Sequence, residues 1–440
     1  MNEPIIKVGL LEHASVVRGT FEGKFEVNNE FTLEGSYEVR NDHGLAVIID
    51  RMGKPYARGN EIRCRAESGS RCRIHDMMIG QKFHWERRED QVFDGNFLFL
   101  NQPDGTLIVI NEIPLEQYLA SVISSEMSSS APSEFLQAHA VISRSWLVAV
   151  IEKGRSMTGP AALCTIQKEG EITRWYGRED HLDYDVCAND HCQRYHGLGH
   201  IRSESVLAAV QKTRGKFLVY DGKICDARYS KSCGGWTENF ENTWEDIPVP
   251  YLVSVNDSSL NRIPLKTEKE STQWILSTPE AYCHTNDESI LRNILPSFDQ
   301  ETKDFYRWRV GYEREELENI LLEKSGIDFG TVMDIMPIRR GSSGRIIQLR
   351  ICGTKHTIIV GKELEIRRWL SKTHLKSSAF AVEIVHGAKN IPQRFIFHGA
   401  GWGHGVGLCQ IGAAVMAMHG VNAEKILQHY YLGAAIRKLY

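Results

Sequence analysis

The chain has 440 residues, of which 42% are hydrophobic and 25% charged, an ordinary composition for a folded globular protein. Its 52 basic and 56 acidic residues give a formal net charge of -4, and no run of Lys or Arg could follow a phosphate backbone. This balance excludes nucleic acid as an expected partner. No stretch approaches the roughly 20 uninterrupted apolar residues of a membrane helix, so we expect no membrane span.

In the first half of the chain, the spacing of the hydrophobic residues changes once, from the alternation of strands to the period of helices. Residues 1–112 alternate polar and apolar positions in short runs separated by Asn, Asp and Gly, which predicts antiparallel strands and hairpins. From Pro114 the apolar positions recur at helical spacing as far as Glu126, and a second helix is predicted from about Pro132 to Ile151. The pattern therefore indicates an α+β protein with a β-rich N-terminal region.

The second half is a mixture of short elements. Residues 154–200 are polar and read as a long structured loop, and residues 257–300 are the least periodic part, which predicts an insertion or linker. Helices are predicted at 203–213 and 314–326, strands at 215–230, and a hairpin at 345–361.

A carboxylate lies on the apolar face of the first helix. Glu126 follows Val122 by four residues and Ile123 by three, so it shares the face that should be buried. Burial raises the pKa of a carboxyl group, and a raised pKa suits a general acid in a glycan-cleaving site. The alternative is a structural ion pair between Glu126 and a basic residue such as Arg144.

Glycine occupies every second position from 399 to 407. In an extended strand one face would carry no side chains, so something must approach the backbone closely. The other face would carry Trp402 and His404, an aromatic plate beside an imidazole, which suits a sugar ring. The alternative is tight packing against another element of the protein. The spacing lacks both G-x-G-x-x-G and the P-loop lysine, which disfavours a nucleotide site.

Two groups of cysteines and histidines could carry chemistry. His181, Cys187 and Cys192, with His191 beside the last, offer the nitrogen and sulfur ligands that suit zinc; buried thiols or a disulfide are the alternatives. Cys409 near His404 could be a thiol nucleophile with its base, but the sequence singles out no third group to orient them.

With these residues identified, the sequence resembles the stage II sporulation protein D (SpoIID/LytB) family. The matching segments are IPLEQYLASVISSEMSSSAPSEFLQAHAVISRSW, DVCANDHCQRYHG, YSKSCGGWTENFENTW, LKSSAFAV and GWGHGVGLCQIGAAVMAMHGVNAEKILQHYY. They occur in family order over residues 105–440. Three positions depart from the family pattern: His139 stands where Gln is usual, Trp146 where Tyr is usual and Cys409 where Ser is common.

The resemblance implies an organisation and a fold. It implies a β-rich region at 1–104, the first part of a SpoIID-like catalytic domain at 105–256, an insertion or linker at 257–304, and the second part of the domain at 305–440. Helices would pack on antiparallel sheets around a groove lined by the glycine-rich segment.

The resemblance also implies a reaction. Characterised members are lytic transglycosylases that degrade peptidoglycan strands stripped of stem peptides, and the glutamate of the S-E-M segment, here Glu126, is the acid/base. No second carboxylate and no cofactor would be required for the chemistry. A structural zinc ion would be held by His181, Cys187 and Cys192. The expected groove residues are Gln193, Tyr195, Trp402, His404, Gln410 and Tyr430, with Arg144, Ser232, Gly234 and Gly235 supporting its wall.

Other interpretations stay open at this stage. The LytB branch is described as an amidase enhancer, so the chain could bind peptidoglycan and stimulate a cell-wall amidase without catalysis of its own. A structural or assembly factor and a zinc-dependent amidase are further alternatives. The family implies a location in the cell envelope or periplasm, whereas the N-terminal segment shows no signal peptide, which leaves the cytoplasm open.

Overall fold

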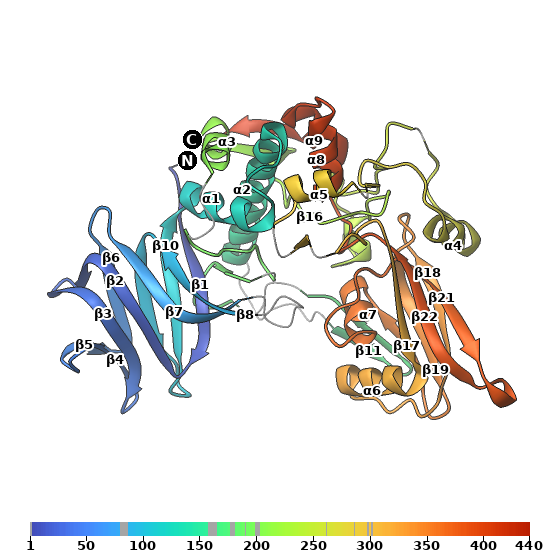
Figure 1. Cartoon of the computed structure of the whole chain (residues 1–440), viewed down its shortest axis with the longest axis horizontal. Coiled ribbons are helices and arrows are strands. Elements are labelled where there is room, and N and C mark those ends of the chain that lie inside the picture. The colour runs from blue at the N-terminus through green and yellow to red at the C-terminus, as the bar shows by residue number, and fades with distance from the viewer. Residues whose placement is uncertain are drawn as a thin grey trace. The chain divides into compact units, whose positions relative to one another are not determined.

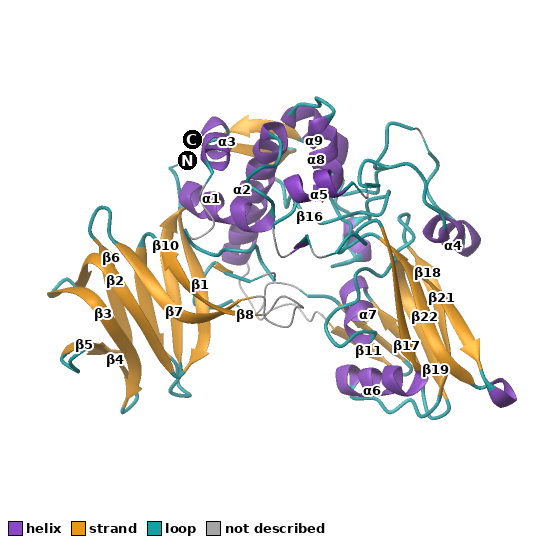
Figure 2. Ribbon diagram, in the orientation of Figure 1, coloured by secondary structure: helices purple, strands orange, loops and turns teal. Residues whose placement is uncertain are grey.

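The chain is described by a computed structural model that covers residues 2–79, 87–156, 165–176, 181–189, 191–198, 203–260, 262–285, 287–296, 299–300 and 302–440. Helices and several separate sheets confirm the predicted α+β class (Figures 1 and 2). The chain folds as two compact units: unit 1 comprises Met1–Ser130, Glu179–Lys216 and Lys438–Tyr440, and unit 2 comprises Ala131–Arg178 and Phe217–Arg437. Among the described residues, none of the helices has the length and hydropathy of a membrane span.

Unit 1 is built on one 11-stranded sheet, with the order β13-β1-β10-β9-β6-β2-β3-β4-β5 and with β7 paired to β2 and β8. Its strands are β1 (Ile5–Ala14), β2 (Val16–Val27), β3 (Phe31–Asp42), β4 (Leu45–Asp50), β5 (Pro55–Gly59), β6 (Glu61–Ala66), β7 (Arg71–Ile79), β8 (Arg87–Phe93), β9 (Asn96–Asn101), β10 (Leu107–Pro114) and β13 (Val186–Cys187). Apolar positions alternate inward, and the rings of Phe21 and Phe25 stack at 4.1 Å. The predicted N-terminal strands are confirmed.

Two helices complete unit 1, α1 (Leu115–Glu126) and α3 (Glu204–Lys212). Pro114 ends β10 and is the N-cap residue of α1, which begins at Leu115. Its missing N–H costs no intrahelical hydrogen bond there, because the N–H groups at the start of a helix have no partner within the helix. The Ser203 side chain caps α3 by accepting a hydrogen bond from the Ser205 amide. Both predicted helices are therefore confirmed.

Unit 2 contains the remaining elements. Its helices are α2 (Ser133–Ser156), α4 (Glu268–Leu276), α5 (Glu288–Ile294), α6 (Arg314–Ser325), α7 (Glu363–Trp369), α8 (Gln410–Met418) and α9 (Ala423–Tyr430), with 3₁₀ turns at Phe240–Asn242 and Ala388–Asn390. Its strands are β11 (Thr165–Lys168), β12 (Glu171–Arg174), β14 (Lys216–Tyr220), β15 (Lys223–Ile224), β16 (Tyr229–Ser230), β17 (Arg307–Glu313), β18 (Val332–Arg340), β19 (Ile346–Gly353), β20 (Thr357–Gly361), β21 (Phe380–His386), β22 (Pro392–Ala400), β23 (Leu408–Cys409) and β24 (Ala435–Lys438).

One hydrophobic core of unit 2 lies between two sheets, β17-β22-β21 and β11-β12-β20-β19-β18. It includes the buried side chains of Trp308, Leu349, Trp369 and Phe397, and helices α6 and α7 pack against the strands (Figure 1). The predicted helix at 314–326 and hairpin at 345–361 are confirmed as α6 and the antiparallel pair β19 and β20. Helix α2 packs against α8 and α9.

The aperiodic segment predicted as an insertion or linker belongs to unit 2, and its described residues include two helices. It contains α4, which begins with a capping box between Thr267 and Glu270, and α5, which is capped by Asp287. Asp257 and Cys283 from the same segment are fully buried, with 0% and 1% exposure. Since a free linker would not bury such side chains, this segment is part of the fold.

The predicted glycine strand is wrong beyond residue 400. Strand β22 ends at Ala400, and Gly401, Gly403, Gly405 and Gly407 have φ of +75°, +96°, +78° and +72°. Extended strands need negative φ, so every second residue breaks the strand and the chain forms a loop that leads to β23. We call residues 401–407 the glycine loop.

The glycine loop packs against the protein itself. A Cβ atom added to Gly401 would stand 2.8 Å from the carbonyl oxygen of Ser232, and one added to Gly403 would stand 3.1 Å from Cβ of Ser230. A Cβ at Gly405 would overlap the guanidinium of Arg345. The close approach that the alternating glycines predict is therefore made by neighbouring segments of unit 2.

We expect Gly407→Ala to destabilise the protein more than Gly420→Ala. Both residues have positive φ, which costs an L-residue about 1–2 kcal/mol. Only at Gly407 would the new Cβ overlap a neighbour, the Arg228 carbonyl oxygen, and overpacking adds about 1–3 kcal/mol; Gly420 has no heavy atom within 4 Å. Denaturant unfolding of the two variants measures the difference, and equal losses would contradict the packing account.

Candidate active site and metal centre

Glu126, the predicted acid/base, is the last residue of α1 in unit 1. It is only 9% exposed, and the backbone amide of Arg194 donates a hydrogen bond of 3.2 Å to its Oε1 atom. A carboxylate removed from water needs such donors, and an amide fixes its orientation without neutralising its charge. The residue that the helical face singled out is therefore a buried and oriented carboxyl group.

Gln193 and Tyr195 flank that amide and are buried, each 1% exposed. The hydroxyl of Tyr118 donates to Oε1 of Gln193 at 3.3 Å, and the hydroxyl of Tyr195 donates to Oδ1 of Asn111 at 2.6 Å. The Tyr195 ring stacks on the Tyr118 ring at 5.1 Å. These contacts fix the segment that carries the Arg194 amide. The predicted contacts of Gln193 and Tyr195 with a glycan stay predictions.

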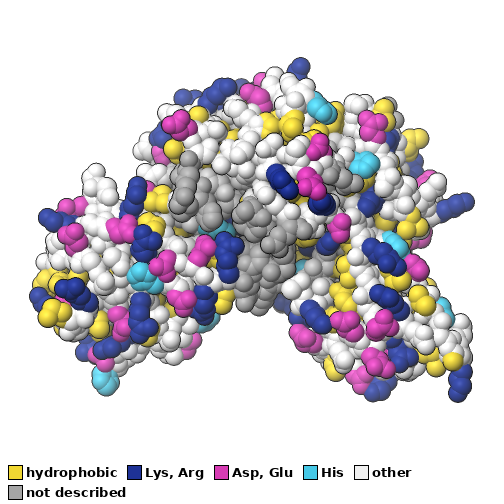
Figure 3. All heavy atoms as spheres, in the orientation of Figure 1, with side chains coloured by type: hydrophobic (Ala, Val, Ile, Leu, Met, Phe, Trp, Pro, Cys, Tyr) yellow, Lys and Arg dark blue, Asp and Glu magenta, His cyan; other side chains and the backbone are white. Residues whose placement is uncertain are grey.

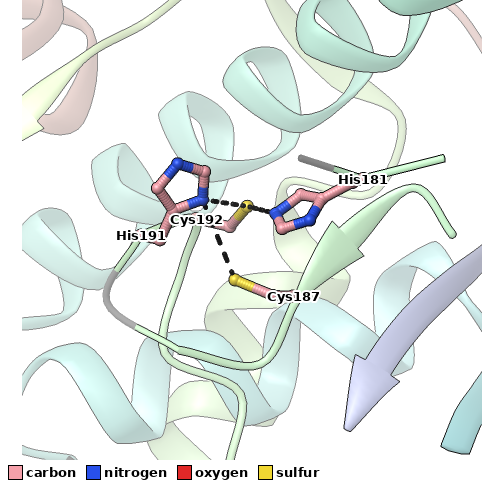
Figure 4. A group of neighbouring side chains, drawn as sticks. All are labelled: His181, Cys187, His191 and Cys192. Atoms are coloured by element: carbon pink, nitrogen blue, oxygen red, sulfur yellow. Dashed lines mark hydrogen bonds between the residues drawn. The ribbon is translucent and has the colours of Figure 1, made fainter. Parts of the chain in front are cut away.

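His181, Cys187, His191 and Cys192 converge in unit 1 (Figure 4). Their ligand atoms all lie within 4.8 Å of one another; Sγ of Cys192 is 3.4 Å from Nε2 of His181 and 3.6 Å from Nδ1 of His191. Hydrogen bonding with Cys192 and with the two imidazoles lowers the pKa of the Cys187 thiol to about 2. Two imidazoles and two thiols are a donor set that suits a tetrahedral zinc ion.

One loop joins this His/Cys cluster to Glu126. Strand β13 pairs in parallel with β1, so that Cys187 lies opposite Gly9, and the amide of Ala188 donates to the Gly9 carbonyl at 3.0 Å. The amide of Tyr195 then donates to the Ala188 carbonyl at 3.0 Å. The cluster therefore lies in the same loop that carries the Arg194 amide.

The predicted site residues of unit 2 form a second group around the glycine loop. Ser232 and Trp402 exchange backbone hydrogen bonds of 3.1 and 2.8 Å, and Gly234 packs directly against Gly401. The half-buried indole of Trp402 lies 4.9 Å from the Phe305 ring and 4.9 Å from Nζ of Lys376. Ser232, Gly234 and Gly235 are buried. Ser232 and Gly234 contact the glycine loop, whereas Gly235 lies against Trp274 and Tyr306.

His404 is held in its neutral form. The amide of Val406 donates to its Nδ1 at 3.0 Å, and its ring lies edge-on to the Trp244 ring at 4.9 Å. Burial, followed by the positive charge of Arg228, holds the pKa of His404 well below its ordinary value. His404 can therefore take part in hydrogen bonding but not supply a positive charge at neutral pH.

Gln410 begins α8 and contacts His139 of α2. The Gln410 amide donates to Nε2 of His139 at 3.0 Å, so the neutral ring carries its proton on Nδ1 and donates to Oγ of Ser143 at 3.2 Å. Burial lowers the pKa of His139 to about 3. This pair joins α2 to α8 inside unit 2, and Gln410 itself is 2% exposed.

Tyr430, Arg144 and Cys409 are also buried inside unit 2. The Tyr430 hydroxyl donates to Oδ1 of Asp257 at 2.6 Å, and Nη1 of Arg144 donates to the Ala140 carbonyl at 3.2 Å. Cys409 accepts hydrogen bonds from the backbone amides of Cys233 and Gly412. Because His404 is bonded to Val406, these contacts do not form the thiol and base pair that Cys409 and His404 could have provided.

The predicted site residues thus fall into two groups. Unit 1 brings together Glu126, the 193–195 segment and the His/Cys cluster, and unit 2 brings together the glycine loop, its supports and Gln410. A buried group that sequence reasoning missed is Cys233, Asp257 and Cys283 beside Cys409. No spacing rule could find it, because its members lie far apart in the chain.

Surface charge gives no sign of a polyanion partner on the face that Figure 3 draws. Basic and acidic side chains are interspersed there on both units, in keeping with the formal net charge of -4. Ion pairs of unit 1 include Arg65 with Glu26 and Arg73 with Glu22.

Comparison with known proteins identifies related sequences. The family model described as "Stage II sporulation protein" matches residues 103–220, and a second, "Domain of unknown function (DUF8618)", matches residues 238–407. An uncharacterized protein of Brachyspira hyodysenteriae is 27% identical over 342 residues, 78% of this chain and 71% of that protein. Stage II sporulation protein D of Bacillus amyloliquefaciens is 24% identical over 335 residues, 74% of this chain and 75% of that protein.

The amidase enhancer of Bacillus subtilis is 25% identical over 243 residues, which cover 52% of this chain and 32% of that protein. Both branches that the sequence resembles are therefore among its relatives. These findings confirm the resemblance that the ordered motifs indicate.

We expect His139→Gln to reduce the acid sensitivity of the fold. In the unfolded chain His139 titrates near its ordinary pKa of 6.5, and in the fold its pKa is about 3, so stability is lost as the pH falls below about 6.5. Between about pH 7.5 and pH 5 this loss amounts to about 2 kcal/mol. Glutamine keeps a polar partner for Gln410 and does not titrate.

Urea unfolding of wild type and His139→Gln at both pH values measures the effect. The other titrating groups are common to the two proteins, so the difference between their pH dependences isolates His139. Parallel pH dependences would refute the assignment.

Proposed function

From the stage II sporulation protein domain that the chain carries at residues 103–220, we infer that the protein acts on peptidoglycan at the cell envelope. We propose that it is a lytic transglycosylase that cleaves the glycan strand, with peptide-stripped strands as its preferred substrate. The observation that carries this proposal is Glu126, a buried and oriented carboxyl group in the matched domain. The same residue is the glutamate of the family's S-E-M segment.

The proposed reaction uses one carboxyl group twice. Glu126 as an acid donates its proton to the oxygen of the bond between N-acetylmuramic acid and N-acetylglucosamine, and the bond from that oxygen to the anomeric carbon breaks. The muramoyl 6-hydroxyl oxygen bonds to the same carbon, and the Glu126 carboxylate accepts the hydroxyl proton. The acid is regenerated, and the products are a 1,6-anhydro sugar and a free 4-hydroxyl group.

The environment of Glu126 supports this double role. The Arg194 amide binds Oε1 in both protonation states, so the carboxyl group keeps its orientation between the two proton transfers. No second carboxylate is required, because the attacking hydroxyl belongs to the substrate, unlike the paired carboxylates of ordinary glycosidases. We assign glycan binding in unit 2 to the half-buried Trp402 and His404, with Arg144, Ser232, Gly234, Gly235, Gln410 and Tyr430 as supports.

We expect Glu126→Gln to abolish strand cleavage. The amide keeps the shape and the hydrogen bond from Arg194 but cannot donate or accept the transferred proton, so the rate should fall by about 100-fold or more. Mass spectrometry of amidase-treated peptidoglycan strands after incubation should detect anhydro-muramoyl fragments with wild type only. Intact strands with wild type would sink the lyase proposal.

Glu116→Gln is the matched control. Glu116 lies on the same helix and is also buried, at 7%, where it accepts a hydrogen bond from the Gly215 amide. The control should keep wild-type cleavage. If Glu116→Gln also loses cleavage, the loss in Glu126→Gln reports damage to α1 and not lost proton transfer.

Similarity to the amidase enhancer of Bacillus subtilis favours a second candidate function. In that case the chain binds peptidoglycan and stimulates a cell-wall amidase, and Glu126→Gln keeps every activity. Pull-down on insoluble peptidoglycan, followed by stem-peptide release by an added amidase, separates the two functions. Stimulation that survives in Glu126→Gln, without anhydro products from wild type, would favour the enhancer.

We further propose that the His/Cys cluster of unit 1 binds a structural zinc ion through His181, Cys187 and Cys192, with His191 as the fourth ligand. The four donor atoms lie close enough for one ion, and a closed set of four protein ligands is typical of structural zinc. The ion would supply no step of the reaction. It would hold the 187–195 loop and, through it, the Arg194 amide at Glu126.

We expect Cys192→Ser to contain one equivalent of zinc less than wild type. Cys352→Ser is the control, because Cys352 is a partly exposed cysteine outside both cysteine groups, and it should keep the wild-type content. Elemental analysis of the purified proteins measures this directly. Equal zinc content in both variants would exclude the unit 1 site, whatever their cleavage activity.

A further inference from the structure

Unit 2 contains a second group of ligand atoms, in its fully buried interior. Cys233, Asp257, Cys283 and Cys409 are 2%, 0%, 1% and 0% exposed, and their ligand atoms all lie within 4.8 Å of one another. They come from four separate places in the chain: the turn after β16, two positions in the 257–304 segment, and the residue before α8. Neither the proposed reaction nor the unit 1 cluster uses them.

The separations fit a single tetrahedral ion. Sγ of Cys233 lies 3.7 Å from Sγ of Cys283. Two thiolates bound at about 2.3 Å to one tetrahedral zinc ion stand about 3.8 Å apart, whereas the sulfurs of a disulfide are about 2.0 Å apart. The two sulfurs are therefore at the distance expected for ligands of one ion and are not bonded to each other.

Backbone amides already point at the sulfur atoms. Sγ of Cys409 accepts hydrogen bonds from the amides of Cys233, at 3.2 Å, and Gly412, at 3.4 Å. Sγ of Cys233 accepts one from the amide of Gly235 at 3.4 Å. Amide donors stabilise a thiolate more than a neutral thiol, and such contacts are typical of the outer shell of a metal–thiolate site.

Two hydrogen-bond donors hold the Asp257 side chain. The Tyr430 hydroxyl donates to its Oδ1 atom at 2.6 Å, and the Cys283 amide donates to its Oδ2 atom at 2.9 Å. Ligand carboxylates in metal sites are typically oriented by hydrogen bonds of this kind.

The outer shell can balance a site with excess negative charge. Nη1 of the buried Arg345 donates to the Cys233 carbonyl at 3.1 Å, and Nη1 of Arg307 donates to the Gly234 carbonyl at 3.0 Å. One zinc ion with three thiolates and one carboxylate carries two negative charges. The two guanidinium groups offset that charge at short range.

We propose that Cys233, Cys283, Cys409 and Asp257 bind one zinc ion in the interior of unit 2. The set is closed, with four protein ligands and no exposed position, so the ion is structural. The ion joins the turn at 232–235, the 257–304 segment and the start of α8. The glycine loop packs against the turn at 232–235 and leads to the start of α8, so the ion fixes both of these neighbours of the loop. This site is independent of the proposed glycan cleavage.

The test uses the full chain with the unit 1 cluster removed, Cys187→Ser/Cys192→Ser. After chelation under reducing conditions, this protein is titrated with Zn²⁺ and, separately, with Co²⁺ as a spectroscopic probe. We expect one equivalent of either metal to bind and the cobalt form to show a thiolate-to-metal charge-transfer band. Thermal unfolding should move to higher temperature when the metal is added.

Two further variants in the same background locate the ligands. Cys409→Ser should weaken binding by at least about tenfold, since the hydroxyl is a poor zinc ligand but still caps α8. Cys225→Ser is the matched control, because Cys225 is an equally buried cysteine of unit 2 outside the cluster, and it should bind as the background protein does. If Cys409→Ser does not fold, Asp257→Asn, which keeps the shape of the side chain, should show the same weakening.

Three results would overturn the proposal. The first is a background protein that takes up no metal while Cys233, Cys283 and Cys409 all react with a thiol reagent on unfolding, because the three are then simply buried thiols. The second is a Cys233–Cys283 disulfide in the protein as purified, detected by peptide mapping. Metal uptake that is the same in Cys409→Ser and Cys225→Ser would also place the ion elsewhere.

Discussion

The hydrogen bond from the Arg194 amide to Oε1 of Glu126 is the contact on which the proposed chemistry depends. Glu126 is the last residue of α1, where a side chain is held less firmly by its own helix than in the middle. Its orientation must therefore come from another segment. That segment belongs to a loop that backbone hydrogen bonds tie to β1 and that also contains the His/Cys cluster.

Both cysteine groups lie in parts of the chain that have little regular secondary structure. The unit 1 cluster lies in the loop around β13, and the buried group of unit 2 lies among a turn, the 257–304 segment and a helix start. Segments of this kind open at low free-energy cost unless something ties them down. Ligand atoms that come together only in the folded state would hold these segments in place when they bind an ion. The free energy of ion binding then adds to the stability of the fold.

The glycine loop is another irregular segment that must be held in place, but neighbouring segments of the protein hold it and no ligand atoms are involved. Positive φ at every second residue lets the chain wind closely past Ser230, Ser232 and Arg345. Close packing and isolated backbone bridges, such as the one between Ser232 and Trp402, define its path in place of a continuous strand ladder. Trp402 and His404 are the side chains that this path leaves half-buried. Their positions follow from the packing of the whole loop, which is why a single added methyl group at Gly407 is a severe change.

The sequence by itself determined the local features. Alternation and helical period placed the N-terminal strands, α1, α3, α6 and the β19–β20 hairpin, and the apolar face of α1 singled out Glu126. His181, Cys187 and Cys192 stood close enough along the chain to suggest their convergence. Each of these predictions came from a hydrophobic period or from a short spacing between residues. Periods and short spacings both describe the geometry of a single segment of the chain.

Only the tertiary structure decided the rest. The alternating glycines are compatible with a flat strand or with left-handed turns, and the neighbours that fill the space, not the period, select the sign of φ. The same holds for Cys233, Asp257, Cys283 and Cys409, which meet only because β16, the 257–304 segment and α8 pack together. Distances between segments remote in the chain depend on how the whole core packs, and no local pattern encodes them.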